Sequence, residues 1–261
     1  MKGVNVKAIL LDIEGTCCPL SFVKEVLFPY AKDNVKSYFR GCLEGKSADP
    51  EAFAAAKKFA SLLDEQSKLD GSGEYAAVDS SKFSESGDVE AFLTSAQSAV
   101  NYHTANDRKI DALKKLQAAI WQRAYDGGTL KAPVYEDVGT ALEEWVGSGL
   151  KVYIYSSGSR PAQKAFFKYS TLGDLRPYLS AFFDTSAGFK REPESYVNIY
   201  QSLGLDHPRQ ILFVTDILAE AKAADAAGLV PVISLRDGNA EIEEEYPYQR
   251  VSDFTKIELN P

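Results

Sequence analysis

The sequence predicts an α/β fold, in which a parallel sheet carries helices on its faces and is interrupted by an inserted, mostly helical cap. Short apolar runs alternate with helical patterns through the second half of the chain, and this alternation is typical of a parallel sheet. One further apolar run stands alone near the N-terminus, ahead of a long region with helical periodicity. We therefore expect an α/β core made of residues 1–20 and 129–261, and a helical cap made of residues 21–128.

The isolated first run covers residues 6–11, reads Val-Lys-Ala-Ile-Leu-Leu, and suits a buried strand. Helical periodicity follows in several stretches, interrupted at residues 68–88 by a segment rich in Gly, Ser and Asp that predicts a loop. The expected cap helices are residues 22–38, 51–63, 89–102 and 108–125.

The second half of the chain supplies the rest of the expected sheet. The expected strands there are residues 150–155, 181–183, 211–214 and 230–235. The helices between and before them are expected at residues 138–145, 160–168, 194–203 and 219–227.

The composition of the chain limits its partners. It has 261 residues, 45% of them hydrophobic, and a formal net charge of -8. An acidic chain has no general affinity for nucleic acid or anionic membranes, and no apolar run approaches the length of a bilayer span. The N-terminus lacks a secretory signal, and the three cysteines are odd in number and lack zinc-site spacing. We expect free thiols, a cytoplasmic location, and neither nucleic acid nor membrane as a partner.

Acidic residues follow two of the expected strands. Asp12 comes directly after the first strand, with Glu14 two residues later, and Asp216 follows the strand at 211–214. Because ligands of open α/β sheets bind beyond the carboxyl ends of the strands, these carboxylates are expected to share one cleft. Asp12 and Asp216 can hold Mg²⁺, a hard cation that prefers oxygen ligands and often shares phosphate oxygens. The sequence therefore predicts magnesium-dependent chemistry on a small phosphate ester.

Hydrogen-bond donors and a positive charge complete this expected site. Ser156 ends the strand at 150–155, and Lys190 lies in a loop before a helix. Ser156 and neighbouring backbone N–H groups can donate to phosphate oxygens, and Lys190 adds positive charge for the transition state. Asp12 can then attack phosphorus and form an aspartyl-phosphate. Glu14 is placed to protonate the leaving oxygen and later to activate water.

Each of these residues also has a structural explanation when taken alone. Asp12 and Glu14 suit a polar turn, Asp216 can cap the helix that follows it, and a lone lysine is usually solvated. The combination favours catalysis, because the acidic elements follow apolar strands in the right order and a helical insertion follows the first of them.

The strings Leu-Leu-Asp-Ile-Glu-Gly-Thr (10–16) and Val-Tyr-Ile-Tyr-Ser-Ser-Gly-Ser (152–159), with Lys190 and Asp216 after them, resemble the haloacid dehalogenase superfamily. Within it, they are most similar to the enolase-phosphatase E1 family of methionine salvage, the acireductone synthases. The resemblance implies a Rossmann-like core and a bifunctional enzyme. Such an enzyme first enolises 2,3-diketo-5-methylthiopentyl-1-phosphate and then removes the phosphate, which gives the acireductone.

The resemblance also implies a set of site residues and a cellular setting. Mg²⁺ would be bound by Asp12, Glu14 and Asp216, of which Asp12 and Glu14 would also be catalytic. The substrate would be contacted by Ser156, Ser157 and Lys190. The family further implies a monomer in the cytoplasm and nucleus whose partner is a small phosphorylated metabolite.

Two other functions fit the same residues. One is a phosphatase of this fold that acts on another small phosphate ester, and the other is a catalytically silent binding protein of this fold. The base for enolisation also stays open at this point. Glu14 is a candidate, because its carboxylate lies beside the expected metal site.

Overall fold

The computed structural model describes residues 5–71, 73–108 and 110–259. The other positions, 1–4, 72, 109 and 260–261, belong to the ranges expected for the core and the cap and lie outside the described residues. Contacts divide the chain into two compact units. One unit comprises Met1–Val23 and Leu130–Pro261, and the other comprises Lys24–Thr129.

The first unit contains a parallel sheet of six strands, so the expected α/β class is confirmed. In sheet order the strands are β3 (Leu179–Phe183), β2 (Lys151–Tyr155), β1 (Ala8–Leu11), β4 (Ile211–Thr215), β5 (Val230–Ser234) and β6 (Gln249–Val251). The chain builds outward from β1 to β2 and β3, and then returns to the other side of β1 with β4. Such a reversal leaves a crevice at the carboxyl ends of the two strands that flank it, here β1 and β4.

The register of the sheet aligns the ends of its central strands. Leu11, the last residue of β1, pairs with Ile154 of β2 and with Val214 of β4. All four residues of β1 are buried, as expected for a parallel strand covered on both faces. The polar residues that follow β1, β2 and β4 therefore emerge at one edge of the sheet.

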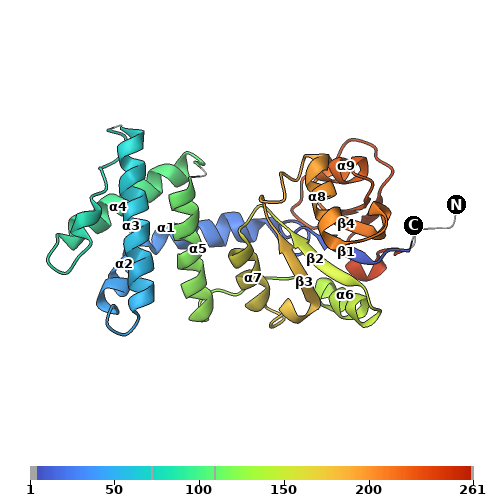
Figure 1. Ribbon diagram of the computed structural model, residues 1–261, viewed down its shortest axis with the longest axis horizontal. Coiled ribbons are helices and arrows are strands. Elements are labelled where there is room, and N and C mark those ends of the chain that lie inside the picture. The colour runs from blue at the N-terminus through green and yellow to red at the C-terminus, as the bar shows by residue number, and fades with distance from the viewer. Residues whose placement is uncertain (1–4, 72, 109, 260–261) are drawn as a thin grey trace. The chain divides into compact units, whose positions relative to one another are not determined.

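Helices cover both faces of this sheet (Figure 1). On one face, α8 (Pro193–Leu203) and α9 (Leu218–Ala226) pack on alternate residues of the central strands, such as Leu10 and Phe213. On the opposite face, α6 (Glu136–Gly147) packs against β2, and α7 (Arg160–Lys168) contacts β3.

The second unit is helical. Its helices are α1 (Phe28–Asp33), α2 (Val35–Glu44), α3 (Pro50–Asp70), α4 (Val89–Ala105) and α5 (Asp111–Asp126), and the π-helical turn Phe22–Leu27 precedes them. The single helix expected at 22–38 is thus divided into shorter segments. Conversely, α3 extends past the expected end at residue 63 and into the expected loop. Asp49 caps its N-terminus with a side chain that accepts from Ala52 N–H, and Gly71 in the left-handed conformation follows its last residue.

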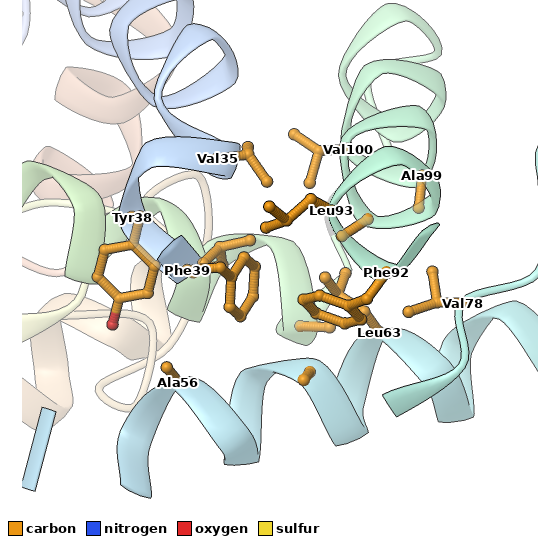
Figure 2. Packing of buried hydrophobic residues seen from close by; sticks show 14 of the residues in the cluster. Val35, Tyr38, Phe39, Ala56, Leu63, Val78, Phe92, Leu93, Ala99 and Val100 are labelled. Carbon is orange, nitrogen blue, oxygen red and sulfur yellow. The ribbon is translucent and has the colours of Figure 1, made fainter. Parts of the chain in front are cut away.

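A cluster of aromatic rings fills the centre of the helical unit. Phe39 of α2 meets Phe92 of α4 edge-on, with ring centroids 5.0 Å apart, and meets Phe83 at 5.2 Å. Figure 2 shows Phe39 and Phe92 pointing toward each other above α3, beside Leu63 and Val78. These edge-to-face contacts add to the burial of apolar area that holds the helices together.

The expectations missed β6, the edge strand. It has only three residues, Gln249–Val251, and lacks the apolar run that marks a strand in sequence. None of the helices in the described part of the chain combines the length and the apolar character required to cross a bilayer.

Replacing Phe39 with Ala should destabilise the helical unit by about 3–5 kcal/mol, because the fully buried ring leaves a cavity. Leu69→Ala is the matched control on α3, since this side chain is 81% exposed and should change stability by less than about 0.5 kcal/mol. Trp121 is in the helical unit and Trp145 in the α/β unit. Tryptophan fluorescence during urea unfolding in a Trp145→Phe background therefore reports the helical unit, and equal midpoints for both variants would contradict this packing.

Candidate active site

Asp12 stands immediately after β1 in a tight turn. Its carboxylate Oδ1 accepts from the N–H of Ile13 at 2.7 Å, and the carbonyl of Ile13 accepts from the N–H of Cys17 at 2.8 Å. The residue is only 5% exposed, and its own N–H donates to Val214 of the neighbouring strand at 3.0 Å. The turn and the sheet together fix the direction of the Asp12 carboxylate.

Lys190 lies between two carboxylates. Its ammonium is 2.5 Å from Asp12 Oδ1 and 3.0 Å from Glu220 Oε2, and its side chain is 12% exposed. Its backbone carbonyl accepts from the hydroxyl of Tyr196 at 2.6 Å, which anchors the loop. Burial alone would lower the pKa of Lys190, but the charges of Asp12 and Glu220 outweigh it and raise the pKa. The ammonium therefore stays charged at neutral pH.

The end of β4 brings two more acidic groups to the same edge. Burial and the negative charge of Asp12 raise the pKa of Asp216 to about 7, and the same causes raise the pKa of Glu220. The hydroxyl of Thr215 lies 2.9 Å from Glu220 Oε2 and 3.3 Å from Asp12 Oδ2. In the described residues, Lys190 is ion-paired with Asp12 and Glu220 whereas Asp216 has no ion pair, so the carboxyl groups of this cluster outnumber the ammonium.

Gly15 determines how closely Asp216 approaches the turn after β1. Its backbone has φ +67°, which favours glycine, and a Cβ at this position would overlap the carboxylate of Asp216. The absence of a side chain lets the carboxylate of Asp216 lie directly against the backbone of the Asp12 turn.

The structure brings three of the expected site residues, Asp12, Lys190 and Asp216, into one cluster. Glu14 is half-buried two residues beyond Asp12, and its backbone pairs with Cys18. No three His, Cys, Asp or Glu side chains converge as metal ligands within the residues that the structure describes. The trio Asp12, Glu14 and Asp216 is therefore not assembled as a closed ligand set.

The two serines lie at the end of β2, next to β1. Ser156 is buried, and its hydroxyl accepts from the N–H of Gly158 at 3.2 Å, whereas Ser157 is exposed. The amide of Gln163, on α7, donates to the carbonyls of Gly158 (2.7 Å) and Phe183 (2.9 Å). This amide ties the serine loop to the end of β3, and the sequence analysis missed it.

Arg236, which the sequence analysis also missed, holds the turn after Asp12 from the side of β5. Its Nε donates to the carbonyl of Thr16 at 3.2 Å, and its two terminal nitrogens donate to both oxygens of Asp137 at 3.0 and 2.8 Å. The guanidinium also stacks on the rings of Tyr135 and Phe254, 4.3 and 4.6 Å from their centroids. Arg236 follows the strand expected at 230–235, so the rule that placed Asp12 and Asp216 at strand ends could have found it.

Cys17 supports the same turn by packing. Its thiol is fully buried and donates to the carbonyl of Asp12 at 3.1 Å, and burial together with the charge of Asp12 raises its pKa. A thiol that resists ionisation is a poor nucleophile, so its contribution here is structural.

Comparison with known proteins agrees with this arrangement. The sequence model of the haloacid dehalogenase-like hydrolases matches residues 6–228. The chain belongs to this family. The membership expected from the sequence is confirmed, and with it the class of the protein as a hydrolase.

Two curated relatives of this hydrolase are each named "Probable bifunctional methylthioribulose-1-phosphate dehydratase/enolase-phosphatase E1". The protein from Physcomitrium patens is 42% identical over 98% of this chain and 49% of its own length. The protein from Arabidopsis thaliana is 43% identical over 95% of this chain and 47% of its own length. The chain thus spans about half the length of the curated relatives it matches.

Solved structures resemble this hydrolase over nearly the whole chain. The UTR4 protein (Unknown transcript 4 protein) of Saccharomyces cerevisiae is 29% identical, with a TM-score of 0.73 over 97% of this chain and 100% of that one. CbbY from Rhodobacter sphaeroides, solved in complex with phosphate, has a TM-score of 0.54 over 96% of both chains. Because CbbY is only 15% identical, this second likeness supports the fold alone.

Asp137→Asn should lower the stability of the α/β unit by about 3 kcal/mol, because it leaves the guanidinium of Arg236, 6% exposed, without its anionic partner. Arg176→Gln is the matched control, since Arg176 pairs with Asp174 at 2.6 Å on an exposed surface where solvent screens the charges. Urea unfolding measures both variants. Equal stabilities of Asp137→Asn and Arg176→Gln would contradict the role given to the Arg236 contact.

Proposed function

We propose that this chain is an enolase-phosphatase, which converts 2,3-diketo-5-methylthiopentyl-1-phosphate to the acireductone by enolisation and removal of phosphate. The observation that carries the proposal is the buried Asp12 carboxylate, oriented at the end of β1 and paired with Lys190 at 2.5 Å. The names of the relatives support the substrate, since each includes an enolase-phosphatase E1. The match of residues 6–228 to a hydrolase family supports the enolase-phosphatase part of these names rather than the dehydratase part.

The residues of the site fit a magnesium ion. Asp216 forms no ion pair with a cationic side chain in the described part of the chain, and its raised pKa is what a carboxylate lacking a counter-charge would show. Asp12, Asp216 and Glu14 would hold the ion. Mg²⁺ would supply charge neutralisation for phosphate oxygens and polarisation of a carbonyl oxygen.

The side chains of this hydrolase would perform the proton and phosphoryl transfers. Asp12 would attack phosphorus, and an aspartyl-phosphate would form as the substrate oxygen departs. Glu14 would donate a proton to that oxygen and then accept one from the water that attacks the aspartyl-phosphate. Glu14 is also the candidate base for enolisation, in which Asp12 forms no covalent bond.

The remaining site residues would bind the phosphate group. Ser156, Ser157 and backbone N–H groups at the end of β2 would donate to its oxygens. Lys190 would stabilise the developing charge, because its ammonium already contacts the attacking carboxylate.

The cellular setting is part of the same proposal. We expect a monomer whose partner is a small phosphorylated metabolite, located in the cytoplasm and also in the nucleus. The buried, free state of Cys17, Cys18 and Cys42 is consistent with a reducing compartment. We further propose that the dehydratase named in the relatives lies in the part of their length that this chain does not match.

The direct test incubates the purified chain with the diketo phosphate and Mg²⁺, and follows enol formation by absorbance and phosphate release in parallel. Both products should form in sequence. Asp12→Asn should slow phosphate release by at least about 10³-fold, as loss of a nucleophile does, and should slow enolisation less. Phosphate release without enolisation would indicate a phosphatase for another ester, and neither activity would indicate a silent binding protein.

Glu14→Asp tests whether the length of the glutamate matters. The shorter side chain should place its carboxylate out of reach of the leaving oxygen, so phosphate release should fall by about 10²-fold. Glu144→Asp, on the exposed surface of α6, is the matched control and should keep full activity. The assays of enol formation and phosphate release measure both variants. Full rates of both half-reactions in Glu14→Asp would show that the extra length of the Glu14 side chain has no special role.

A further inference from the structure

Asn239 follows β5 and reaches across to the turn that carries Asp12. Its side-chain Nδ2 donates to the carbonyl of Gly15 at 2.9 Å and lies 3.4 Å from the carbonyl of Ser234. Its backbone N–H donates to the carbonyl of Arg236 at 3.1 Å, which closes a turn. Contacts from both the main chain and the side chain therefore fix the position of Asn239.

These two carbonyls also determine which way the amide faces. A carbonyl oxygen can only accept a hydrogen bond, so the NH₂ group must face Gly15 and Ser234, and Oδ1 must face away from them. In the described part of the chain, Oδ1 is buried and receives no hydrogen bond. A buried acceptor without a donor is destabilising, so this position calls for a donor from outside the protein.

Asn239 Oδ1 lies beside the carboxylate of Asp216. A Cβ built on Gly15 would overlap Asp216 Oδ2 and would lie 3.0 Å from Asn239 Oδ1, so both oxygens flank the same point above Gly15. A donor or a cation placed beside that point would satisfy both acceptors. Because each O–H···O bond spans about 2.7–2.8 Å, one water molecule can reach both oxygens.

We propose that Asn239 Oδ1 accepts a hydrogen bond from a water molecule on the cation held by Asp12 and Asp216. This inference rests on the proposed function for the presence of the cation. Mg²⁺ usually keeps several of its waters in protein sites, and these waters need acceptors around them. Partners that orient the groups on a metal typically change its affinity by about 10- to 100-fold.

A purely structural role for Asn239 predicts a different pattern of variants. If its only task were to donate to Gly15, then Asn239→Asp and Asn239→Ala would both lose that bond and would weaken cation binding alike. If Oδ1 serves the cation, Asn239→Asp keeps an acceptor beside Asp216 and adds a negative charge. The two variants therefore separate the two roles.

The experiment measures Mg²⁺ affinity directly, by isothermal titration calorimetry with magnesium chloride in the presence of inorganic phosphate. Asn239→Ala should weaken binding by about 10- to 100-fold, whereas Asn239→Asp should bind within about threefold of the unaltered chain or more tightly. Asp216→Asn is the reference for loss of the site. The magnesium-dependent rise in the unfolding midpoint provides a second readout on the same proteins.

Unaltered affinity in Asn239→Ala, or equal weakening in both Asn239 variants, would overturn the inference while leaving the proposed function intact. Absence of Mg²⁺ binding in the unaltered chain would overturn it as well. If the predicted pattern is found in a chain that does not process the diketo phosphate, the inference stands and the proposed function fails.

Discussion

The ion pair between Lys190 and Asp12 is the interaction on which the rest of the site depends. Asp12, Asp216 and Glu220 bring three carboxyl groups into a buried edge of the sheet, where unpaired charges are strongly destabilising. Lys190 contacts both Asp12 and Glu220, but its single positive charge offsets only one negative charge. Asp216 has no ion pair in the described residues, and burial together with the charge of Asp12 raises its pKa.

The order of the strands makes this arrangement possible. β1 lies between β2 and β4, and the last residue of β1 pairs with a residue near the end of each neighbour. One edge of the sheet therefore receives Asp12, Ser156 and Asp216 from strands far apart in sequence. The turn after β1 is then held by groups from outside it. Arg236 donates to Thr16, and Asn239 donates to Gly15. The loop after β5 thus stabilises the conformation that orients Asp12.

Most of the fold and the main site residues could be predicted from sequence, because buried parallel strands are short apolar runs and their carboxyl ends carry polar residues. Asp12 and Asp216 were found in this way, whereas Lys190 was chosen as a lysine in a loop before a helix. The three-residue strand β6 has no such run, and the helix α3 is extended by contacts that periodicity does not show. Gln163 and Asn239 act through hydrogen bonds to backbone carbonyls, which depend on tertiary structure rather than on sequence pattern. Arg236 directly follows an expected strand, so the strand-end rule could have included it.

The central claim is that Asp12 attacks phosphorus first and forms an aspartyl-phosphate, which water then hydrolyses. The most direct measurement is the stereochemical outcome at phosphorus, with substrate whose phosphoryl group is made chiral by oxygen isotopes. Each in-line displacement inverts the configuration, so transfer to Asp12 followed by transfer to water predicts net retention. Net inversion would show that water attacks the substrate directly, and it would contradict the role of Asp12 as the nucleophile.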